Sequence, residues 1–419
     1  MGHVLEEPAL RCRFKACGHE RGVCDMAPTG GALAELRRTN LEKVVSALRQ
    51  GGTLSQSELA RVTGLSEATV SNLVRVLVQD DRVKLSKGRR NGRSVNLVEL
   101  DAAAEELVLA VTVGRETITA AAVDYEGAIL VERSRPRVPE SPYDEERCIL
   151  VKLIEELRAV DGVSPRPIAG VGLALCVSID PVSNTVPEGF GHRLPAFDPS
   201  WYGVDVTGEL GAEIGLPVRL INDCDAALLA EARWGAARGC RDALYLHLSS
   251  GVGGAMLLGG LLYRGGPGGI GELGHSSTDT SGLLCVCGNR GCLETKVGGP
   301  TLLSHVASLH GDDLTLGRLA ELARSGDPGC VRIVSDAAQD IVAGLANVVA
   351  VLAPQRFILG GELADAGSAL LDPVSRGMQR MASPRNWRGC VALAELGGQA
   401  IARGAARFAF ESSANVFSL

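Results

Sequence analysis

The sequence lacks any hydrophobic run of the roughly 18 residues that a membrane-spanning helix requires, and its N-terminus lacks the apolar core of a signal peptide. We therefore expect a cytoplasmic protein with no membrane partner. In that setting the 12 cysteines are expected to be thiols or metal ligands rather than disulfides. Because 46% of the 419 residues are apolar and 22% are charged, the composition excludes wholesale disorder and predicts two or three folded domains.

The chain has no excess of positive charge: 42 lysines and arginines against 49 acidic residues give a net charge of −7, and this average argues against a nucleic-acid partner. The charge is unevenly distributed, however. Residues 31–100 carry 12 basic and 7 acidic side chains, whereas residues 101–419 have a net charge of −12. A basic module is thus attached to an acidic body, and we expect any phosphate contacts to be confined to the module.

Residues 1–30 show no apolar periodicity, and we expect them to form a disordered leader, with Met26 as an alternative start of the protein. A metal site is the competing interpretation of this segment, because it contains Cys12, Cys17, His19 and Cys24.

Residues 31–100 have the pattern of three short helices followed by a β-hairpin. Helical periodicity begins near Leu36. Ser55 and Glu58 form a capping box at the start of a helix over Gln56–Thr63. Ser66 is expected to cap a third helix, which buries a stripe formed by Val70, Leu73, Val74 and Leu77. Strands are expected at Val83–Ser86 and Ser94–Val98.

This order of elements predicts a winged helix-turn-helix that binds a double-stranded DNA operator. The exposed face of the third helix is polar near its N-terminus, as in a recognition helix that meets base edges. The turn from Lys87 to Arg93 is basic enough to contact phosphates. The candidate DNA-binding residues are Ser66, Glu67, Thr69, Ser71, Asn72, Arg75, Arg89, Arg90 and Arg93. A solvated charged hairpin on a small helical domain is the alternative.

The body, from residue 105 to 419, has an internal repeat of α/β type. A strand-loop-strand-turn-strand pattern over residues 107–132 recurs over residues 243–263. Such a repeat predicts two related α/β lobes around a cleft, which is where ligands usually bind.

A cluster of metal-ligand residues lies in the second half of the body. His275 is followed within 18 positions by Cys285, Cys287 and Cys292, with glycines between them. Three thiolates and one imidazole are the ligand set of a closed tetrahedral zinc site. We therefore expect a structural Zn²⁺, because no ligand position is left open for catalysis.

Several motifs together resemble the ROK family of repressors, open reading frames and sugar kinases. They are the glycine-rich run from Leu262 to His275, the cysteine cluster with Cys292-Leu-Glu294, Asn222-Asp223, Leu359-Gly-Gly361 and Gly404-Ala-Ala406. The resemblance extends from about Leu36 to the C-terminus. It implies a duplicated actin-like or hexokinase-like (ribonuclease H-like) fold. It also implies a regulator rather than a kinase, because the family's kinases lack the N-terminal winged helix.

The resemblance further implies which residues bind the sugar. The family's sugar contacts correspond to Asn222, Asp223, Glu272, His275 and Glu294, and Asp223 occupies the position of the kinase base. Carboxylates and an amide suit vicinal hydroxyls, which both donate and accept hydrogen bonds. Capping or ion pairing is the alternative role for these side chains. The segment Cys176–Asp180 departs from the family's Pro-Gly-Pro pattern, so one wall of the sugar pocket is expected to differ.

The nucleotide side departs from the kinase pattern. The family kinases begin with Asp-x-Gly-Gly-Thr, and the matching residues here are Thr112-Val-Gly-Arg-Glu116. A carboxylate at Glu116 repels phosphate, and the Arg115 side chain prevents close approach of the backbone. The second loop, Ser249–Gly254, is better kept. We therefore expect no catalytic residues.

These observations predict a sugar-responsive transcriptional repressor that binds a sugar or sugar-phosphate effector and assembles as a homodimer or homotetramer. One alternative is an active sugar kinase that also binds DNA, supported by Asp223 and the second loop. Another is a regulator controlled by a protein partner.

Overall fold

The computed structural model describes residues 30–80, 82–90, 93–101, 105–187, 197–266, 270–381 and 387–411. The chain divides into two compact units, residues 1–102 and 103–419, which we call the N-terminal unit and the body. The expected leader, including the cysteines before residue 25, lies outside the described residues.

The N-terminal unit has three helices, α1 (Gly30–Gly51), α2 (Gln56–Thr63) and α3 (Glu67–Gln79). The expected capping box at the start of α2 is confirmed, because the Glu58 N–H donates to Ser55 Oγ at 3.3 Å and the Ser55 N–H donates to Glu58 Oε2 at 2.8 Å. The predicted stripe of α3 is buried, and it packs with Val44, Leu48 and Leu59 in one small core. Helix α1 begins six residues before the expected start.

Strands β2 (Val83–Arg90) and β3 (Arg93–Leu100) form an antiparallel hairpin, and the short β1 (Leu54–Ser55) pairs with β3. Both hairpin strands are longer than predicted, because the ladder continues to the pair formed by Arg90 and Arg93. The predicted basic turn is therefore mostly strand, and only the Asn-Gly connection separates the two strands.

The body contains two five-stranded sheets with the same topology, which accounts for the sequence repeat. Their strand orders are β6-β5-β4-β7-β8 and β11-β10-β9-β12-β13. In each sheet the first three strands of the chain are antiparallel, and the last two are added in parallel. The strands are β4 (Leu107–Val113), β5 (Thr117–Val123), β6 (Ile129–Pro136), β7 (Ile168–Leu175), β8 (Val218–Asn222), β9 (Ala243–Leu248), β10 (Val252–Leu258), β11 (Leu261–Tyr263), β12 (Arg356–Gly360) and β13 (Cys390–Leu393).

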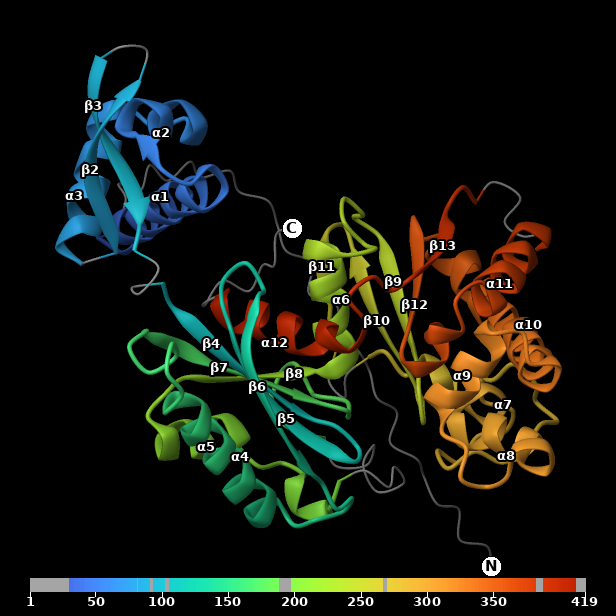
Figure 1. Cartoon of the computed structure of the whole chain (residues 1–419). Coiled ribbons are helices and arrows are strands. Elements are labelled where there is room, and N and C mark those ends of the chain that lie inside the picture. The colour runs from blue at the N-terminus through green and yellow to red at the C-terminus, as the bar shows by residue number, and fades with distance from the viewer. Residues whose placement is uncertain are drawn as a thin grey trace, which may run out of the picture. The chain divides into compact units, whose positions relative to one another are not determined.

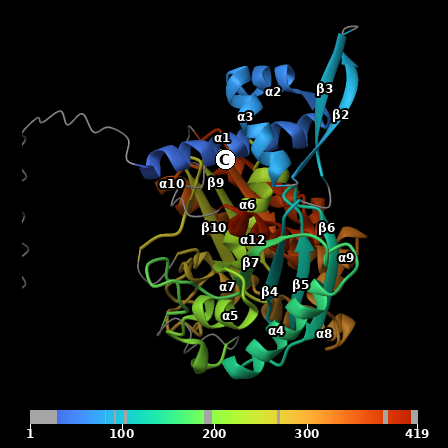
Figure 2. The same ribbon diagram turned by 90° about the vertical axis from the view of Figure 1, so that its left-hand side faces the viewer.

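Alternating side chains of the first sheet enter two different cores. One face packs against α4 (Tyr143–Arg158) and α5 (Val206–Ile214). The other face shares a core with α6 (Asp223–Trp234), α12 (Ala400–Phe410) and strands of the second sheet (Figures 1 and 2). Helices α6 and α12 therefore lie between the two sheets and hold the two lobes together.

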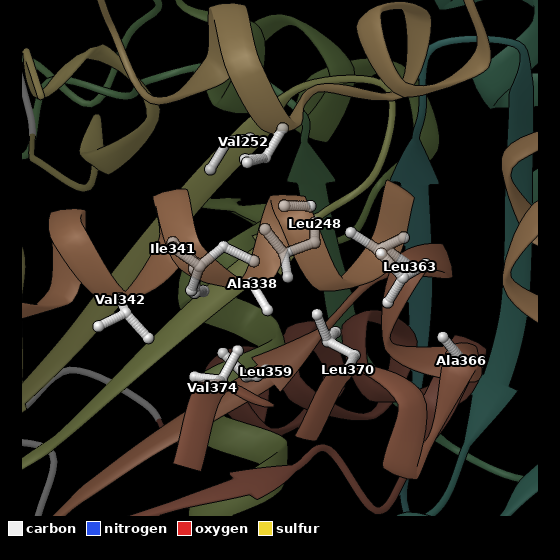
Figure 3. Packing of buried hydrophobic residues seen from close by; sticks show 14 of the residues in the cluster. Leu248, Val252, Ala338, Ile341, Val342, Leu359, Leu363, Ala366, Leu370 and Val374 are labelled. Atoms are coloured by element: carbon white, nitrogen blue, oxygen red, sulfur yellow. The ribbon is translucent and has the colours of Figure 1, made fainter. Parts of the chain in front are cut away.

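The second sheet packs on its other face against the helices α8 (Gly299–His310), α9 (Leu316–Arg324), α10 (Pro328–Val351) and α11 (Ser368–Arg380). Figure 3 shows Ala338 and Ile341 of α10 among Leu248, Leu359 and Val374 of this core. By length and composition alone, α10 is the one helix of the described residues that could cross a membrane. Its apolar residues instead fill this core.

Close packing of α6 and α12 depends on glycine. A Cβ at Gly404 would overlap the backbone carbonyl of Ala226 in α6, and a Cβ at Gly172 would overlap that of Ala405 in α12. A backbone carbonyl cannot move aside as a flexible side chain can. We therefore expect Gly404→Ala to lower the free energy of unfolding by about 1–3 kcal/mol.

Urea denaturation of the full chain measures this effect. Gly398→Ala is the matched control, because nothing lies within 4 Å of a Cβ at that position. Equal stability of the two variants would contradict the packing argument.

Candidate functional site

The Asn222-Asp223 pair lies where β8 ends and α6 begins. Asn222 is the N-cap of α6, with Oδ1 accepting hydrogen bonds from the N–H groups of Cys224 (2.9 Å) and Asp225 (3.2 Å). Its amide nitrogen donates to the Val177 carbonyl at 3.0 Å. The Asn222 side chain thus caps α6, which is the alternative role considered above. It also links the start of α6 to the segment that follows β7.

Asp223 lies in the first turn of α6 in a largely enclosed position. Burial raises the pKa of the Asp223 carboxyl, and His247 together with the Cys224 N–H, which donates to Oδ1 at 2.7 Å, opposes that rise. His247 comes from β9 of the second lobe, and its Nδ1 lies 3.4 Å from the Tyr245 hydroxyl. The sequence analysis missed His247, because no local pattern relates it to Asp223.

Glu272 and His275 lie together on the second lobe, at the short 3-10 helix Leu273–His275. Glu272 Oε2 is 3.6 Å from His275 Nε2. Its other oxygen, Oε1, accepts a hydrogen bond from the buried Ser178 hydroxyl of the first lobe. Ser178 belongs to the segment Cys176–Asp180, which differs from the family's Pro-Gly-Pro pattern. The different sequence thus supplies a hydrogen-bond donor to Glu272, a candidate sugar contact.

The four predicted metal ligands are brought together, with their ligand atoms within 4.8 Å of one another. His275 Nδ1 is 3.4 Å from Cys285 Sγ, and Cys287 Sγ is 3.6 Å from Cys292 Sγ. Burial raises the pKa of Cys292 to about 12. This thiol therefore keeps its proton until a cation displaces it. The residues could hold a metal ion of the predicted kind.

Glu294 lies against the second glycine loop. Its Oε2 accepts a hydrogen bond from the Val252 N–H at 2.8 Å. Nearby, the Ser249 hydroxyl donates to Glu362 Oε1 at 3.2 Å. Two donors of this loop are therefore already used by carboxylates, of which Glu294 is also a candidate sugar contact and Glu362 would repel a phosphate group.

The first loop, between β4 and β5, is a tight turn closed by a hydrogen bond from the Gly114 N–H to the Thr117 carbonyl (2.9 Å). Its conformation is fixed by Arg137, which donates to the Gly114 carbonyl at 2.9 Å and forms a fully buried ion pair with Glu146. Glu116 is exposed on this turn. The loop thus offers a carboxylate where the family's kinases have a threonine.

In the N-terminal unit, the candidate recognition residues lie on one side of α3. Glu67, Asn72 and Arg75 are exposed, whereas Thr69 and Ser71 are half-buried. Ser66 caps the helix, with its hydroxyl accepting from the Thr69 N–H at 3.1 Å. Arg75 donates to Asn72 Oδ1 at 3.3 Å.

The predicted wing residues lie at the end of the hairpin. Arg89 is exposed on β2, and Arg90 and Arg93 form the last pair of the ladder. The side chains of these last two residues lie outside the described part of the chain.

Comparison with known proteins decides the family. A model of the ROK family matches residues 108–412. The chain belongs to the ROK family. A model of a domain of unknown function, DUF7343, matches residues 37–96 of the N-terminal unit.

The relatives of this ROK protein include both regulators and kinases. The xylose repressor of Bacillus subtilis is 26% identical over 80% of this chain and 85% of its own. The transcriptional repressor Mlc of Escherichia coli is 27% identical over 84% of this chain and 88% of its own. The glucokinase of Streptomyces coelicolor is 31% identical over 73% of this chain and 98% of its own.

Solved structures of the family have the same fold. A ROK glucokinase from Streptomyces griseus, solved with glucose and AMPPNP, is 29% identical and covers 73% of this chain with a TM-score of 0.63. A ROK transcriptional regulator described as a homologue of Mlc covers 90% of this chain, with 21% identity and a TM-score of 0.73. The mixed α/β body is therefore of the hexokinase-like type found in the family's kinases and regulators.

Proposed function

We propose that this ROK protein is a sugar-responsive transcriptional repressor whose body binds a sugar effector without phosphorylating it. One observation carries the proposal. Glu272 and His275 lie 3.6 Å apart and Glu272 accepts a hydrogen bond from Ser178, while an exposed carboxylate, Glu116, lies on the first phosphate loop and Glu362 accepts a hydrogen bond from Ser249 of the second. Phosphoryl transfer needs positioned phosphates and neutralised charge, and the first loop, with its exposed Glu116, opposes both.

The N-terminal unit is proposed to be the DNA-binding part, as a winged helix-turn-helix. Three helices, a capped third helix with polar exposed residues and a basic hairpin are the parts that such a module uses. Matches to the relatives named as repressors cover 80% and 84% of this chain, whereas the glucokinase match covers 73%. We infer two copies of the chain on a two-fold symmetric operator.

The Cys3His cluster is proposed to hold a structural Zn²⁺ that orders the loop carrying the sugar site. His275 would bind the ion through Nδ1, because that nitrogen faces the thiols, while Nε2 faces Glu272. The ion would therefore fix the ring that the sugar meets.

An active sugar kinase is the second candidate, since Asp223 is present with a raised pKa and could accept a hydroxyl proton. A coupled assay of ADP release across a panel of hexoses and pentoses decides between the two. We expect no turnover. A rate above about one per second, ordinary for an enzyme, would overturn the proposal.

Sugar binding is tested with Glu272→Gln. The variant loses the charge of a carboxylate that accepts a hydrogen bond from Ser178 and faces His275. Calorimetry should show sugar affinity weakened by roughly 10- to 100-fold, since hydrogen bonds to charged groups contribute about 1.5–3 kcal/mol. Glu145→Gln, at an exposed site on α4, is the matched control. Absence of heat with every sugar in the unmodified protein would favour control by a protein partner.

DNA binding is tested with Arg89→Ala and Asn72→Ala. Loss of a phosphate contact at Arg89 should weaken binding to all sequences and reduce the salt slope by about one, whereas loss of Asn72 should reduce discrimination between bases. Fluorescence anisotropy at several salt concentrations measures both effects. Arg332→Ala, an exposed arginine of the body, is the control for the change in charge. Equal salt slopes for Arg89→Ala and Arg332→Ala would exclude the wing contact.

Zinc binding at the Cys3His cluster is tested by chelation and by pH. A chelator should lower the unfolding temperature of the full chain, and Cys292→Ser should remove most of that response. Because the pKa of Cys292 is raised to about 12, metal binding must release a proton, so zinc affinity should fall as the pH is lowered from 8 to 6. Cys148→Ser, an exposed cysteine of α4, serves as the control. Unchanged stability on chelation would contradict a structural metal.

A further inference from the structure

A second group of metal-ligand side chains lies in segments that contribute nothing to the sites described above. His310 is the last residue of α8, Asp327 is the N-cap of α10, and Cys330 lies in the first turn of α10. The imidazole, carboxylate and thiol ligand atoms all lie within 4.8 Å of one another. Three different ligand chemistries therefore converge where two helix ends meet.

The distances between these atoms match the geometry of a tetrahedral zinc ion. Bonds of about 2.0–2.1 Å to nitrogen and oxygen and about 2.3 Å to sulfur place neighbouring ligand atoms roughly 3.3–3.8 Å apart. His310 Nε2 lies 3.3 Å from Asp327 Oδ1 and 3.7 Å from Cys330 Sγ. In the Cys3His cluster, a nitrogen–sulfur distance is 3.4 Å and a sulfur–sulfur distance is 3.6 Å. The second group is thus as closely spaced as the first.

A glycine lies beside the ligand atoms. Gly329 lies between Asp327 and Cys330, and a Cβ there would sit 2.8 Å from Leu309 Cδ1, 3.4 Å from Asp327 Oδ1 and 4.0 Å from His310 Nε2. Gly329 has no positive φ, so backbone conformation does not require glycine at this helical position, where it is less favourable than alanine. Glycine therefore adds no side chain beside the ligand atoms, and the neighbouring Leu309 side chain is mostly exposed.

One of the three side chains is buried and the other two are partly exposed to solvent. Cys330 is fully buried, so its sulfur is held in place, whereas the His310 and Asp327 side chains are 23% and 27% exposed. Asp327 is further fixed by the Cys330 N–H, which donates to its Oδ1 at 2.9 Å. A cation can therefore enter from the solvent side and meet ligands that are already oriented.

We propose that His310, Asp327 and Cys330 form a second zinc site, which fastens the C-terminus of α8 to the N-terminus of α10. Mixed nitrogen, oxygen and sulfur ligands favour Zn²⁺ over Mg²⁺ or Ca²⁺. On binding, the Cys330 thiol releases its proton to solvent, and His310 binds as a neutral imidazole. Water completes the coordination, because the cluster supplies three protein ligands.

The experiment is a count of zinc ions in the full-length protein after loading with zinc and removal of the excess, by mass spectrometry of the metal content. The unmodified protein should hold about two zinc ions per chain. Asp327→Asn should reduce this to about one, because asparagine can still cap α10 but lacks the anionic oxygen. Cys330→Ser should have the same effect as Asp327→Asn.

Control variants distinguish the two zinc sites from each other, and loss of a ligand from a change in the fold. His305→Gln, an exposed histidine of α8, should leave about two zinc ions. Cys292→Ser should remove the other ion, so that Cys292→Ser combined with Asp327→Asn should hold almost none. If the Cys3His proposal fails, the unmodified protein holds one ion that Asp327→Asn removes. A zinc content unchanged by both Asp327→Asn and Cys330→Ser overturns the second site and leaves the trio as a hydrogen-bonded helix cap.

Discussion

The candidate sugar site depends on the two nitrogens of one imidazole. His275 presents Nδ1 to the cysteine cluster and Nε2 to Glu272, which in turn accepts a hydrogen bond from Ser178. An ion bound to Nδ1 leaves the proton on Nε2, where it can be donated to the carboxylate. The orientation of Glu272 would then be set by two contacts, one with the metal-bound His275 and one with Ser178 of the first lobe. Without the cation, the ring loses its fixed partner.

Carboxylates lie at the candidate sugar site and at both candidate phosphate loops. Sugar hydroxyls can donate to Asp223 and Glu272, but a nucleotide phosphate would meet Glu116 at the first loop and Glu362 at the second. Each of these two charges would repel phosphate. Under the proposed function, carboxylates would thus serve to bind a neutral polyol and to disfavour ATP within one fold.

Local features of the chain were predictable and distant contacts were not. Helix α2 spans Gln56–Thr63 as predicted, because its capping box acts through neighbouring residues. The four metal ligands were also predictable, since they lie within 18 positions of one another. By contrast, Ser178 and Glu272 are 94 residues apart, and His247 approaches Asp223 from another sheet. No spacing rule relates such residues, so their contacts could not be predicted from the sequence and were found only in the structure.

The topology explains how a ligand in this site could act at a distance. Asp223 and Ser178 belong to the first lobe, whereas Glu272, His275 and His247 belong to the second, so the site's contacts cross between lobes. Helices α6 and α12 lie between the two sheets. At Gly172 and Gly404 the backbones are in such close contact that no space remains for a Cβ. A closure of the lobes must therefore move these helices as rigid bodies rather than compress them. A sugar shifts that equilibrium only as far as its affinity differs between the open and closed forms, and contacts to both lobes are the source of such a difference.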